Sequence, residues 1–305
     1  MKLFHVLESQ QFTKEIIEEL FDDADSLKDN PEKDLLKNKV MCTLFYEPST
    51  RTRFSFESAM IRLGGNIIST EAAGMFSSAV KGESLVDTIR IVDDYSDIIV
   101  LRTGIDDGAH QAAGVSKVAV INAGEGKYGQ HPTQALLDLY TIKKELGRID
   151  NIKLVIVGDL KNGRTVRSLA YLLGKYEKIK ISFVSPENLR LEKDIKDYLE
   201  RHKVEYEESN ELNKLLPEAD IVYMTRIQKE RMSPEEYQLA NGKFKITTKE
   251  LEMMKPGARL LHPLPNAGEI TLPIEVEEND KRVAYFRQAR NGLYIRMALL
   301  KKIFS

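Results

Sequence analysis

Short runs of strand-forming residues alternate with stretches of helical periodicity along this chain, and this alternation constrains the fold more than any other feature. Strands are expected at residues 40–46, 66–70, 98–101, 118–122, 153–159, 179–184, 221–224 and 259–262. Helices are expected at residues 13–27, 49–63, 82–96, 132–146, 164–175, 189–202 and 292–304. Parallel strands need long crossover connections, usually helices, so this order predicts an α/β fold with parallel sheets.

The pattern restarts near residues 147–151, where a helix gives way to a new buried strand. A chain of 305 residues has room for about two domains of roughly 150 residues each. We therefore expect two domains, 1–150 and 151–291, each a mostly parallel sheet flanked by helices. The helix at 132–146 is expected to join them, and the final helix, about 292–305, to pack back on the first domain.

Charge and hydropathy exclude several classes of protein. The chain has 45 Lys and Arg against 47 Asp and Glu, a net charge of −2 without a long block of one sign, so no nucleic-acid partner is expected. No stretch approaches the roughly 20 apolar residues of a membrane-spanning helix, and the N-terminus resembles no signal peptide, so we expect a cytoplasmic protein. The single cysteine, Cys42, supplies neither an intrachain disulfide nor a set of metal ligands, and no metal or cofactor is expected.

Polar and basic residues follow the expected strands, where ligands bind in open α/β sheets. The run Ser49-Thr50-Arg51-Thr52-Arg53 opens a helix after the first strand, so its hydroxyl, guanidinium and backbone N–H groups favour an anion site. A helix cap with solvated arginines is the alternative. Other strand ends carry residues that could equally be surface, cap or salt-bridge groups: Lys81, Arg102, His131, Arg164, Arg226, Gln228 and the segment 262–265 with its two prolines.

Several common catalytic signatures are not indicated by the sequence. It has no G-x-x-x-x-G-K-[ST] phosphate loop and no G-x-S-x-G nucleophile elbow, and the glycines at 124 and 126 are not expected to complete a G-x-G-x-x-G dinucleotide fingerprint. The strand ends carry donors and cations, without an obvious pair of carboxylates. The sequence therefore predicts a site for a highly anionic, non-nucleotide substrate that stabilises developing negative charge.

The same segments, in the same order, resemble the catalytic chains of the aspartate/ornithine carbamoyltransferase family over essentially the whole chain. The STRTR motif is shared by carbamoyltransferases generally, whereas TRIQKER and HPLP resemble the aspartate branch, because the ornithine branch typically has a Cys-Leu-Pro loop. The segments that carry the resemblance are 45–53 (FYEPSTRTR), 81–83 (KGE), 131–134 (HPTQ), 158–165 (GDLKNGRT), 225–231 (TRIQKER) and 262–265 (HPLP).

This resemblance implies transfer of the carbamoyl group of carbamoyl phosphate to the amino group of L-aspartate, in pyrimidine biosynthesis. The first domain would bind carbamoyl phosphate and the second L-aspartate. The carbamoyl phosphate residues would be Ser49, Thr50, Arg51, Thr52, Ser77, Arg102, His131, Gln134, Leu264 and Pro265, with Thr52, Arg102 and His131 contacting the carbonyl oxygen as the catalytic residues. The aspartate residues would be Lys81, Arg164, Arg226 and Gln228.

Family members are trimers in which a serine and a lysine of the neighbouring chain complete each site, and Ser77 and Lys81 match them. The resemblance thus implies a homotrimer with shared active sites, and leaves open whether a regulatory chain binds. The chain departs from the family at two places: Thr103-Gly104 replaces His-Pro, and Asn266 replaces an arginine. Because Asn266 removes a charge near the expected aspartate site, a carbamoyltransferase for another amino acid stays an alternative, as does a non-catalytic regulatory paralogue.

Overall fold

The computed structural model of the protein describes residues 4–126 and 129–305. Internal contacts divide the chain into two compact units. The first runs up to Leu137 and also takes in Arg290–Ser305, and the second is Asp138–Ala289. The division falls within the helix α6 (Pro132–Leu146), while the boundary expected from the sequence lies just after it. Among the described residues, no helix combines the length and the apolar character needed to cross a membrane.

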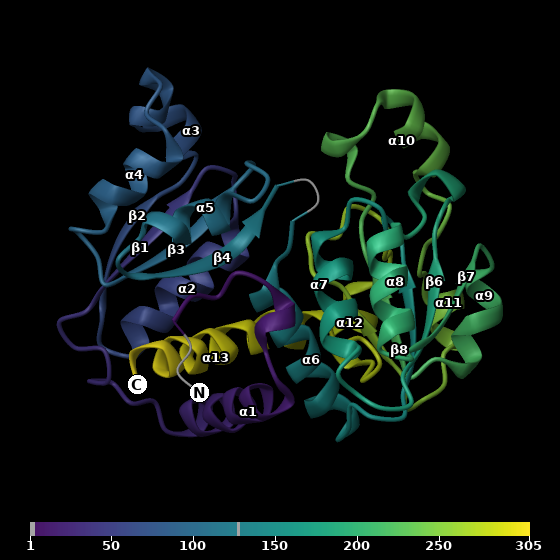
Figure 1. Cartoon of the computed structure of the whole chain (residues 1–305). Coiled ribbons are helices and arrows are strands. Elements are labelled where there is room, and N and C mark those ends of the chain that lie inside the picture. Colours follow the sequence, from purple (N-terminus) through teal and green to yellow (C-terminus); the bar gives the residue numbers. More distant parts are fainter. Residues whose placement is uncertain (1–3, 127–128) are drawn as a thin grey trace. The chain divides into compact units, whose positions relative to one another are not determined.

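The first unit is built on a four-stranded sheet in the order β2-β1-β3-β4, in which all neighbouring strands are parallel (Figure 1). Its central strands β1 and β3 are buried along nearly their whole length, whereas the edge strand β2 is largely exposed. Such burial is typical of a parallel sheet covered on both faces. The strands are β1 (Val40–Phe45), β2 (Asn66–Thr70), β3 (Ile98–Thr103) and β4 (Ala119–Glu125).

Helices cover both faces of this sheet. Leu85 and Ile89 of α4 and Ala112 of α5 pack with Cys42 and Leu44 of β1 on one face. Figure 1 shows α2 on the other side of the strands, with α1 beyond it. The helices of the first unit are α1 (Lys14–Asp29), α2 (Thr50–Arg62), α3 (Ala73–Phe76), α4 (Leu85–Val92), α5 (Gly108–Val115), the start of α6 and the end of α13 (Tyr285–Phe304).

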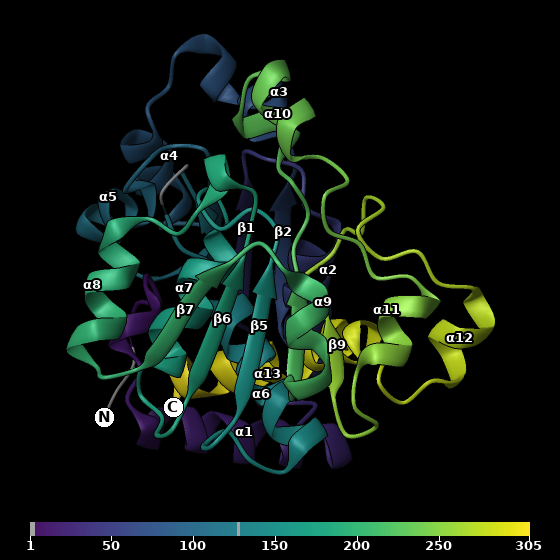
Figure 2. The same cartoon turned by 90° about the vertical axis from the view of Figure 1, so that its right-hand side faces the viewer.

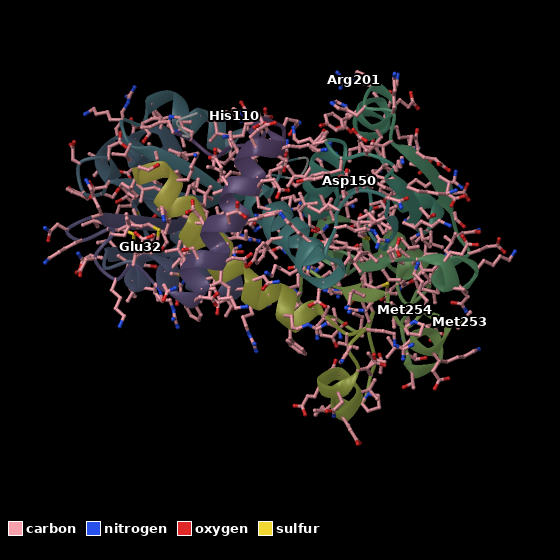
Figure 3. All side chains as sticks on the ribbon, turned by 90° about the horizontal axis from the view of Figure 1, so that it is seen from below. Glu32, His110, Asp150, Arg201, Met253 and Met254 are labelled. Atoms are coloured by element: carbon pink, nitrogen blue, oxygen red, sulfur yellow. The ribbon has the colours of Figure 1, made fainter. Side chains whose placement is uncertain are left out.

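The end of α13 is tied to α1 and to the loop after it. The Lys301 ammonium lies 2.6 Å from Glu32 Oε1 and 3.2 Å from Asp23 Oδ1, and Figure 3 labels Glu32. The first helix, α1, begins at a Thr13 hydroxyl that accepts a hydrogen bond from the Ile16 N–H at 3.3 Å, a regular N-cap. These contacts attach the last turns of the chain to the first unit.

The second unit holds a five-stranded sheet in the order β7-β6-β5-β8-β9, again entirely parallel (Figure 2). One face packs on α9 and α11, whose residues share a core with Val155, Val222 and Leu260, and Figure 2 shows α7 behind the strands on the other face. The strands are β5 (Lys153–Val157), β6 (Lys180–Val184), β7 (Glu205–Ser209), β8 (Ile221–Met224) and β9 (Arg259–Leu261). The helices are α7 (Arg164–Leu173), α8 (Lys193–Arg201), α9 (Leu212–Leu215), α10 (Pro234–Ala240), α11 (Thr248–Met253) and α12 (Ile274–Asn279).

Each sheet has a point where its strand order reverses. The first strand of the first sheet, β1, pairs with β2 on one side and β3 on the other, and β5 stands in the same way between β6 and β8. Ligands of open α/β sheets bind beyond the carboxyl ends of the strands at such a switch point. Binding sites are therefore expected in the loops that follow β1 and β3 and in those that follow β5 and β8.

The predicted α/β class with two parallel sheets is confirmed, and each predicted strand is present. The predicted helix at 82–96 is wrong in its bounds, because the Ser84 hydroxyl caps α4 by accepting from the Asp87 N–H at 3.1 Å. The predicted helix at 189–202 begins only at Lys193, after a short 3₁₀ turn. The acidic edge strand β7 and the helix α5 were not predicted. Neither has a strong apolar pattern, since β7 reads EYEES and α5 reads GAHQAAGV.

Candidate active site

The run of residues 49–53 forms the first turn of α2, beyond the carboxyl end of β1. Ser49 is the N-cap residue, Thr50 and Arg51 are exposed, and Thr52 is buried. The Ser49 N–H donates to Glu71 Oε1 at 3.1 Å, and Arg53 Nη1 pairs with the other oxygen of Glu71 at 3.1 Å. Ser49 and Arg53 therefore link this turn to Glu71, while Arg51 lies exposed on the same turn.

Arg102, near the end of β3, reaches the same turn. Its Nη1 donates to the Ser49 hydroxyl and to the Ala123 carbonyl oxygen, both at 3.5 Å. Its Nε lies 3.3 Å from Glu47 Oε2. A carboxylate on one edge of a guanidinium fixes the direction of its other donors, so Glu47 orients Arg102. Glu47 was not predicted as a site residue, although its position just beyond the end of β1 could have indicated it.

His131 lies just before α6 and beside the turn of α2. Its Nε2 lies 3.3 Å from Thr52 Oγ1, and its Nδ1 lies 3.5 Å from Thr133 Oγ1. His131, Thr52 and Gln134 are all buried, with Gln134 in the first turn of α6. Within the first unit the structure thus joins Ser49 to Arg102, and Thr52 to His131, at the switch point of the sheet.

The end of β4 and the loop after it contain glycines at 124, 126 and 129. These do have the spacing of a dinucleotide-binding turn, G-x-G-x-x-G, so the expectation that they would not complete it is wrong. In that motif the glycines lead directly into a helix whose N-terminus holds the pyrophosphate. Here α6 begins only at Pro132. Glu125 between the glycines is buried and accepts from the Ala109 N–H at 2.7 Å. Burial raises the pKa of the Glu125 carboxyl, although that hydrogen bond lowers it. The end of β4 at Glu125 is therefore packed inward, which does not favour a dinucleotide site.

Ser77 and Lys81 lie in a separate exposed segment between β2 and α4. The Ser77 hydroxyl donates to the Ala73 carbonyl at 2.5 Å and accepts from the Ala79 N–H at 3.2 Å. The Lys81 side chain is exposed and makes no hydrogen bond or ion pair with any described residue. Neither residue hydrogen-bonds to the Ser49–Arg102 or Thr52–His131 pairs within the part of the chain that the structure describes.

In the second unit a buried carboxylate joins two loops that carry predicted site residues. Asp159, after β5, accepts from the Asn162 N–H at 2.9 Å and from the Gln228 N–H at 3.4 Å. Arg231 reinforces this link by donating to the Asn162 carbonyl at 3.4 Å. Burial raises the pKa of the Asp159 carboxyl, although the hydrogen bonds from Asn162 and Gln228 lower it. Sequence reasoning gave Asp159 no role, and its place directly after a buried strand was the available signal.

Arg226 follows β8 and forms a bidentate ion pair with Glu230. Its Nη1 donates to Glu230 Oε2 at 2.9 Å, and its Nη2 donates to Oε1. This pairing raises the pKa of Arg226 and lowers the pKa of Glu230. The guanidinium therefore already meets a carboxylate in the fork geometry that a substrate carboxylate also uses. Arg164 is the first residue of α7 and is half-buried, as is Gln228.

Leu264 and Pro265 belong to the loop after β9 in the second unit, whereas the other residues predicted to bind carbamoyl phosphate belong to the first. Leu264 has a left-handed backbone with φ of 55°, and the Leu264–Pro265 peptide bond is cis. The next residue, Asn266, closes its own loop: its Oδ1 accepts from the Gly268 and Ile270 N–H groups at 3.1 and 3.0 Å. Asn266 thus serves local turn geometry, as asparagine often does.

A cavity of about 160 Å³ lies beside the carboxyl ends of β5 and β8 in the second unit. Thr225 and Ile227 line it, while Arg226 and Gln228 do not. These two predicted aspartate ligands are therefore not part of the cavity wall. Its remaining lining residues are Gly158, Met224, Tyr237, Ala240, Asn241, Gly242, Phe244, Lys245, Ala267, Gly268 and Glu269.

No group of three or more His, Cys, Asp or Glu side chains could hold a metal ion within residues 4–126 and 129–305. Cys42 is buried in β1, and burial raises the pKa of its thiol to about 12. A thiol that stays protonated is a poor nucleophile. The described clusters consist instead of hydrogen-bond donors and cations, which suit the binding and polarisation of an anion.

Two domain models of one family match the chain. The model of the carbamoyl-P binding domain of aspartate/ornithine carbamoyltransferases matches residues 5–144, and the model of the Asp/Orn binding domain matches residues 150–303. The chain therefore belongs to the aspartate/ornithine carbamoyltransferase family, and the membership expected from its motifs is confirmed.

Similar proteins lie in the aspartate branch of this family. Aspartate carbamoyltransferase 3, chloroplastic, of Pisum sativum is 53% identical over 98% of this chain and 77% of its own length. The aspartate carbamoyltransferase catalytic subunit of Methanocaldococcus jannaschii is 46% identical over 99% of this chain and 98% of its own. A solved aspartate transcarbamoylase of Trypanosoma cruzi, in complex with carbamoyl phosphate and aspartate, has a TM-score of 0.93 and 35% identity, covering 100% of this chain and 98% of that one.

Proposed function

We propose that this protein is an aspartate carbamoyltransferase, which transfers the carbamoyl group of carbamoyl phosphate to the amino group of L-aspartate. The products are N-carbamoyl-L-aspartate and phosphate, in pyrimidine biosynthesis. The observation that carries the proposal is the pair of contacts at the switch point of the first sheet, Arg102 to Ser49 and His131 to Thr52. They gather donors for an anion in the unit whose sequence matches a carbamoyl-P binding domain. Relatives that are about half identical over nearly the whole chain bear the name of this activity.

In the proposed carbamoyl phosphate site, different residues bind the phosphate, the carbonyl oxygen and the amino group of the substrate. Ser49, Thr50, Arg51 and Thr52 bind the phosphate, since a helix N-terminus offers free N–H groups and a positive dipole end. Thr52, Arg102 and His131 donate to the carbonyl oxygen. The carbamoyl amino group is held by Gln134 and by the backbone carbonyls near Leu264 and Pro265.

The proposed aspartate site uses Arg164, Arg226 and Gln228 for the two carboxylates. The Asp159 contacts to Asn162 and to Gln228 support this assignment, because they fix the loops that carry these residues at the ends of neighbouring strands. Arginine suits the role because its planar fork matches a carboxylate. Two such residues account for a preference for a dicarboxylic amino acid over one with a cationic side chain.

The proposed reaction is a direct displacement at the carbamoyl carbon. The deprotonated amine of aspartate forms the new C–N bond, and the C–O bond to phosphate breaks as the tetrahedral intermediate collapses. The amine loses its second proton to the leaving phosphate, so the step needs no protein base. Negative charge develops on the carbonyl oxygen, where the donors of Thr52, Arg102 and His131 stabilise it. Binding both reactants in line contributes the proximity effect.

The proposed assembly is a homotrimer in which Ser77 and Lys81 of one chain complete the site of the next. Its support is that Lys81 sits in an exposed segment without an ion pair to any described residue, next to Met75 and Val80, whose exposed fractions are 71% and 62%. Large apolar side chains with that exposure favour a surface that another chain covers. Binding of a regulatory chain and a cytoplasmic location stay predictions, and the plant relatives are named chloroplastic.

A phosphate-release assay tests the proposed function. The purified protein is mixed with carbamoyl phosphate and, in turn, L-aspartate, L-glutamate, L-asparagine and L-ornithine, with a reaction lacking amino acid to measure spontaneous hydrolysis. We expect phosphate release with aspartate alone, matched by N-carbamoyl-L-aspartate in mass spectrometry. Release with a different amino acid would favour the alternative substrate that Asn266 left open, and no release above hydrolysis would favour the regulatory paralogue.

A further inference from the structure

A chain of buried hydrogen bonds runs through the second unit from α6 to the loop after β9. The Tyr223 hydroxyl donates to Asp138 Oδ2 at 2.7 Å, and Gln288 Nε2 donates to Asp138 Oδ1 at 2.6 Å. The His262 N–H then donates to Gln288 Oε1 at 2.8 Å. Exposed fractions are 0% for Asp138 and Tyr223 and 1% for Gln288 and His262. We call these four residues the Asp138 relay.

The donor and the acceptor of each hydrogen bond in the relay follow from the chemistry of its side chains. The two oxygens of an ionised Asp138 only accept hydrogen bonds, so the Gln288 amide must turn its NH2 end toward Asp138 and its oxygen toward His262. Burial and the neighbouring Asp138 raise the pKa of Tyr223 well above its ordinary value, so its hydroxyl keeps the proton that it donates. Buried polar groups without partners are costly, and each member of the relay therefore holds the next in one orientation.

The last contact of the relay sets the backbone of Leu264. The Leu264 N–H donates to His262 Nδ1 at 2.8 Å, which requires the neutral ring with its proton on Nε2. That Nε2 lies 3.8 Å from Glu269 Oε2. Leu264 has a φ of 55°, a left-handed conformation that leucine rarely adopts and that its surroundings must hold. Gln288 and His262 thus hold the backbone from the His262 N–H to the Leu264 N–H, the stretch that leads into the Leu264 carbonyl.

We propose that Asp138, Tyr223 and Gln288 are positioning residues that act through His262 to aim the Leu264 carbonyl at the amino group of the substrate's carbamoyl moiety. This inference rests on the proposed function and adds to it residues that do not touch the substrate. The relay residues lie on α6, β8, α13 and the loop after β9, so hydrogen bonds connect this loop to the core of the second unit.

Two substitutions test the relay at different points. Gln288→Met removes both polar ends of the amide at similar length, and Tyr223→Phe removes one hydroxyl at the far end. The matched control is Tyr171→Phe, because Tyr171 is also buried in the second unit and donates to a carboxylate, Asp194 Oδ2, at 3.3 Å. Hydrogen–deuterium exchange of the peptide that contains Leu264 should speed up at least tenfold in Gln288→Met and less in Tyr223→Phe, and should not change in the control.

The kinetic readout separates positioning from general damage. In Gln288→Met, kcat/KM for carbamoyl phosphate should fall 10- to 100-fold, while competitive inhibition by inorganic phosphate stays within twofold, since the proposed phosphate ligands lie in the first unit. Asp138→Asn should retain most activity, because its amide oxygen can still accept from Gln288 while its NH2 donates to the Tyr223 oxygen; Asp138→Leu should not.

Three results would overturn the inference. They are unchanged exchange at Leu264 in Gln288→Met, parallel loss of phosphate inhibition and of turnover, and equal loss in Asp138→Asn and Asp138→Leu. A parent protein that releases no phosphate with aspartate would instead overturn the proposed function, and with it the substrate half of this inference. The exchange measurement would still decide whether the relay holds the loop.

Discussion

The hydroxyl oxygen of Thr52 lies 3.3 Å from Nε2 of His131, although 79 residues separate them in the sequence. Thr52 comes from the first turn of α2, and His131 from the residue before α6. Both side chains are buried, each with an exposed fraction of 6%. In this contact one of the two groups donates to the other. A substrate oxygen that replaces this hydrogen bond, with the His131 proton on Nε2, would accept from both, which is the arrangement that stabilises an oxyanion.

His131→Ala should therefore lower kcat by about 10²–10³-fold, because its proposed contact strengthens as charge develops on the carbonyl oxygen. The KM for carbamoyl phosphate should change by less than about threefold, since most binding comes from the phosphate ligands. Steady-state kinetics with both substrates varied measure the two effects. His110→Ala is the matched control, since His110 is exposed in the same unit and its Nδ1 lies 3.1 Å from Asp107 Oδ1. A binding defect without a loss of kcat would count against the assignment.

Arg51→Ala should remove most activity, because it deletes a charge-assisted contact to the phosphate, worth several kcal/mol in kcat/KM. Arg62→Ala is the control, because Arg62 is exposed in the last turn of the same helix and donates to the Ser58 hydroxyl at 3.2 Å. The control should keep full activity. If folded Arg51→Ala turns over within about threefold of the parent, a difference of only about 0.65 kcal/mol, Arg51 does not bind the phosphate.

Arg226→Ala should raise the KM for aspartate by roughly 10- to 100-fold, because a carboxylate of the substrate loses the guanidinium proposed to bind it with two hydrogen bonds. The KM for carbamoyl phosphate should stay nearly constant, since the proposed partner of Arg226 is a carboxylate of aspartate. Lys229→Ala changes a nearby exposed cation, whose ammonium lies 5.7 Å from the Tyr237 ring centre, and should have little effect. A carbamoyl phosphate defect as large as the aspartate defect would remove Arg226 from the amino-acid site.

The central strands could be predicted because buried strands consist of consecutive apolar residues, which are visible in the sequence. Continuous apolar runs such as KLVIV at β5 and IVYM at β8 are typical of strands in a sheet that is covered on both faces. The edge strand β7 carries three glutamates in five residues and pairs with β6 through its backbone alone. Its formation depends on the neighbouring strand, which local sequence does not reveal. The same holds for α5, whose small residues pack against β3 and β4 without an amphipathic pattern.

The candidate site was predictable in its residue types but not in its contacts. Arg102 and Arg226 follow strands, so their place near the switch points could be expected. That Glu47 orients Arg102 at 3.3 Å, or that Asp159 links the two loops of the second unit, depends on tertiary structure. Carboxylates that orient cationic ligands look like ordinary surface acids in a sequence. Their role emerges only when the fold brings the strand ends together.

Glu145 should make a pH-dependent contribution to stability. Its carboxylate accepts from Arg287 Nε at 2.6 Å and from Arg259 Nε at 2.7 Å. Burial raises the pKa of Glu145, but these hydrogen bonds outweigh it and hold the pKa below its ordinary value. Because the folded-state pKa is depressed, the contribution is complete above the pKa of about 4.3 of a glutamate in the unfolded chain, and it is lost as the pH falls through the lower folded-state pKa.

Glu145→Gln should therefore lower the free energy of unfolding by about 1–3 kcal/mol at pH 7, and the difference from the parent should shrink as the pH falls through the folded-state pKa of Glu145. Urea unfolding at a series of pH values measures it. Glu218→Gln is the control, since Glu218 is exposed and its pair with Lys153 should contribute little. A difference that is equal at pH 7 and at low pH would contradict the proposed cause.

Lys81 gives the most direct test of shared sites. It is exposed, and it makes no ion pair with any residue that the structure describes, so its removal should barely affect a self-contained chain. If it completes a neighbour's site, Lys81→Ala should instead abolish most activity while the fold and the trimer stay intact. Circular dichroism and light scattering check the fold and the assembly.

Mixing Lys81→Ala chains with Arg51→Ala chains should then restore activity, although each variant alone is inactive. In a cyclic trimer of both kinds, one site combines an intact Arg51 with an intact Lys81 from the next chain, so mixed trimers should show roughly one third of the parent's activity. A tag on one variant allows the mixed trimers to be recovered after exchange of chains. A monomer, or a trimer with self-contained sites, cannot be rescued in this way, because every site would keep one lesion. Verified mixed trimers without activity would therefore rule out the shared site.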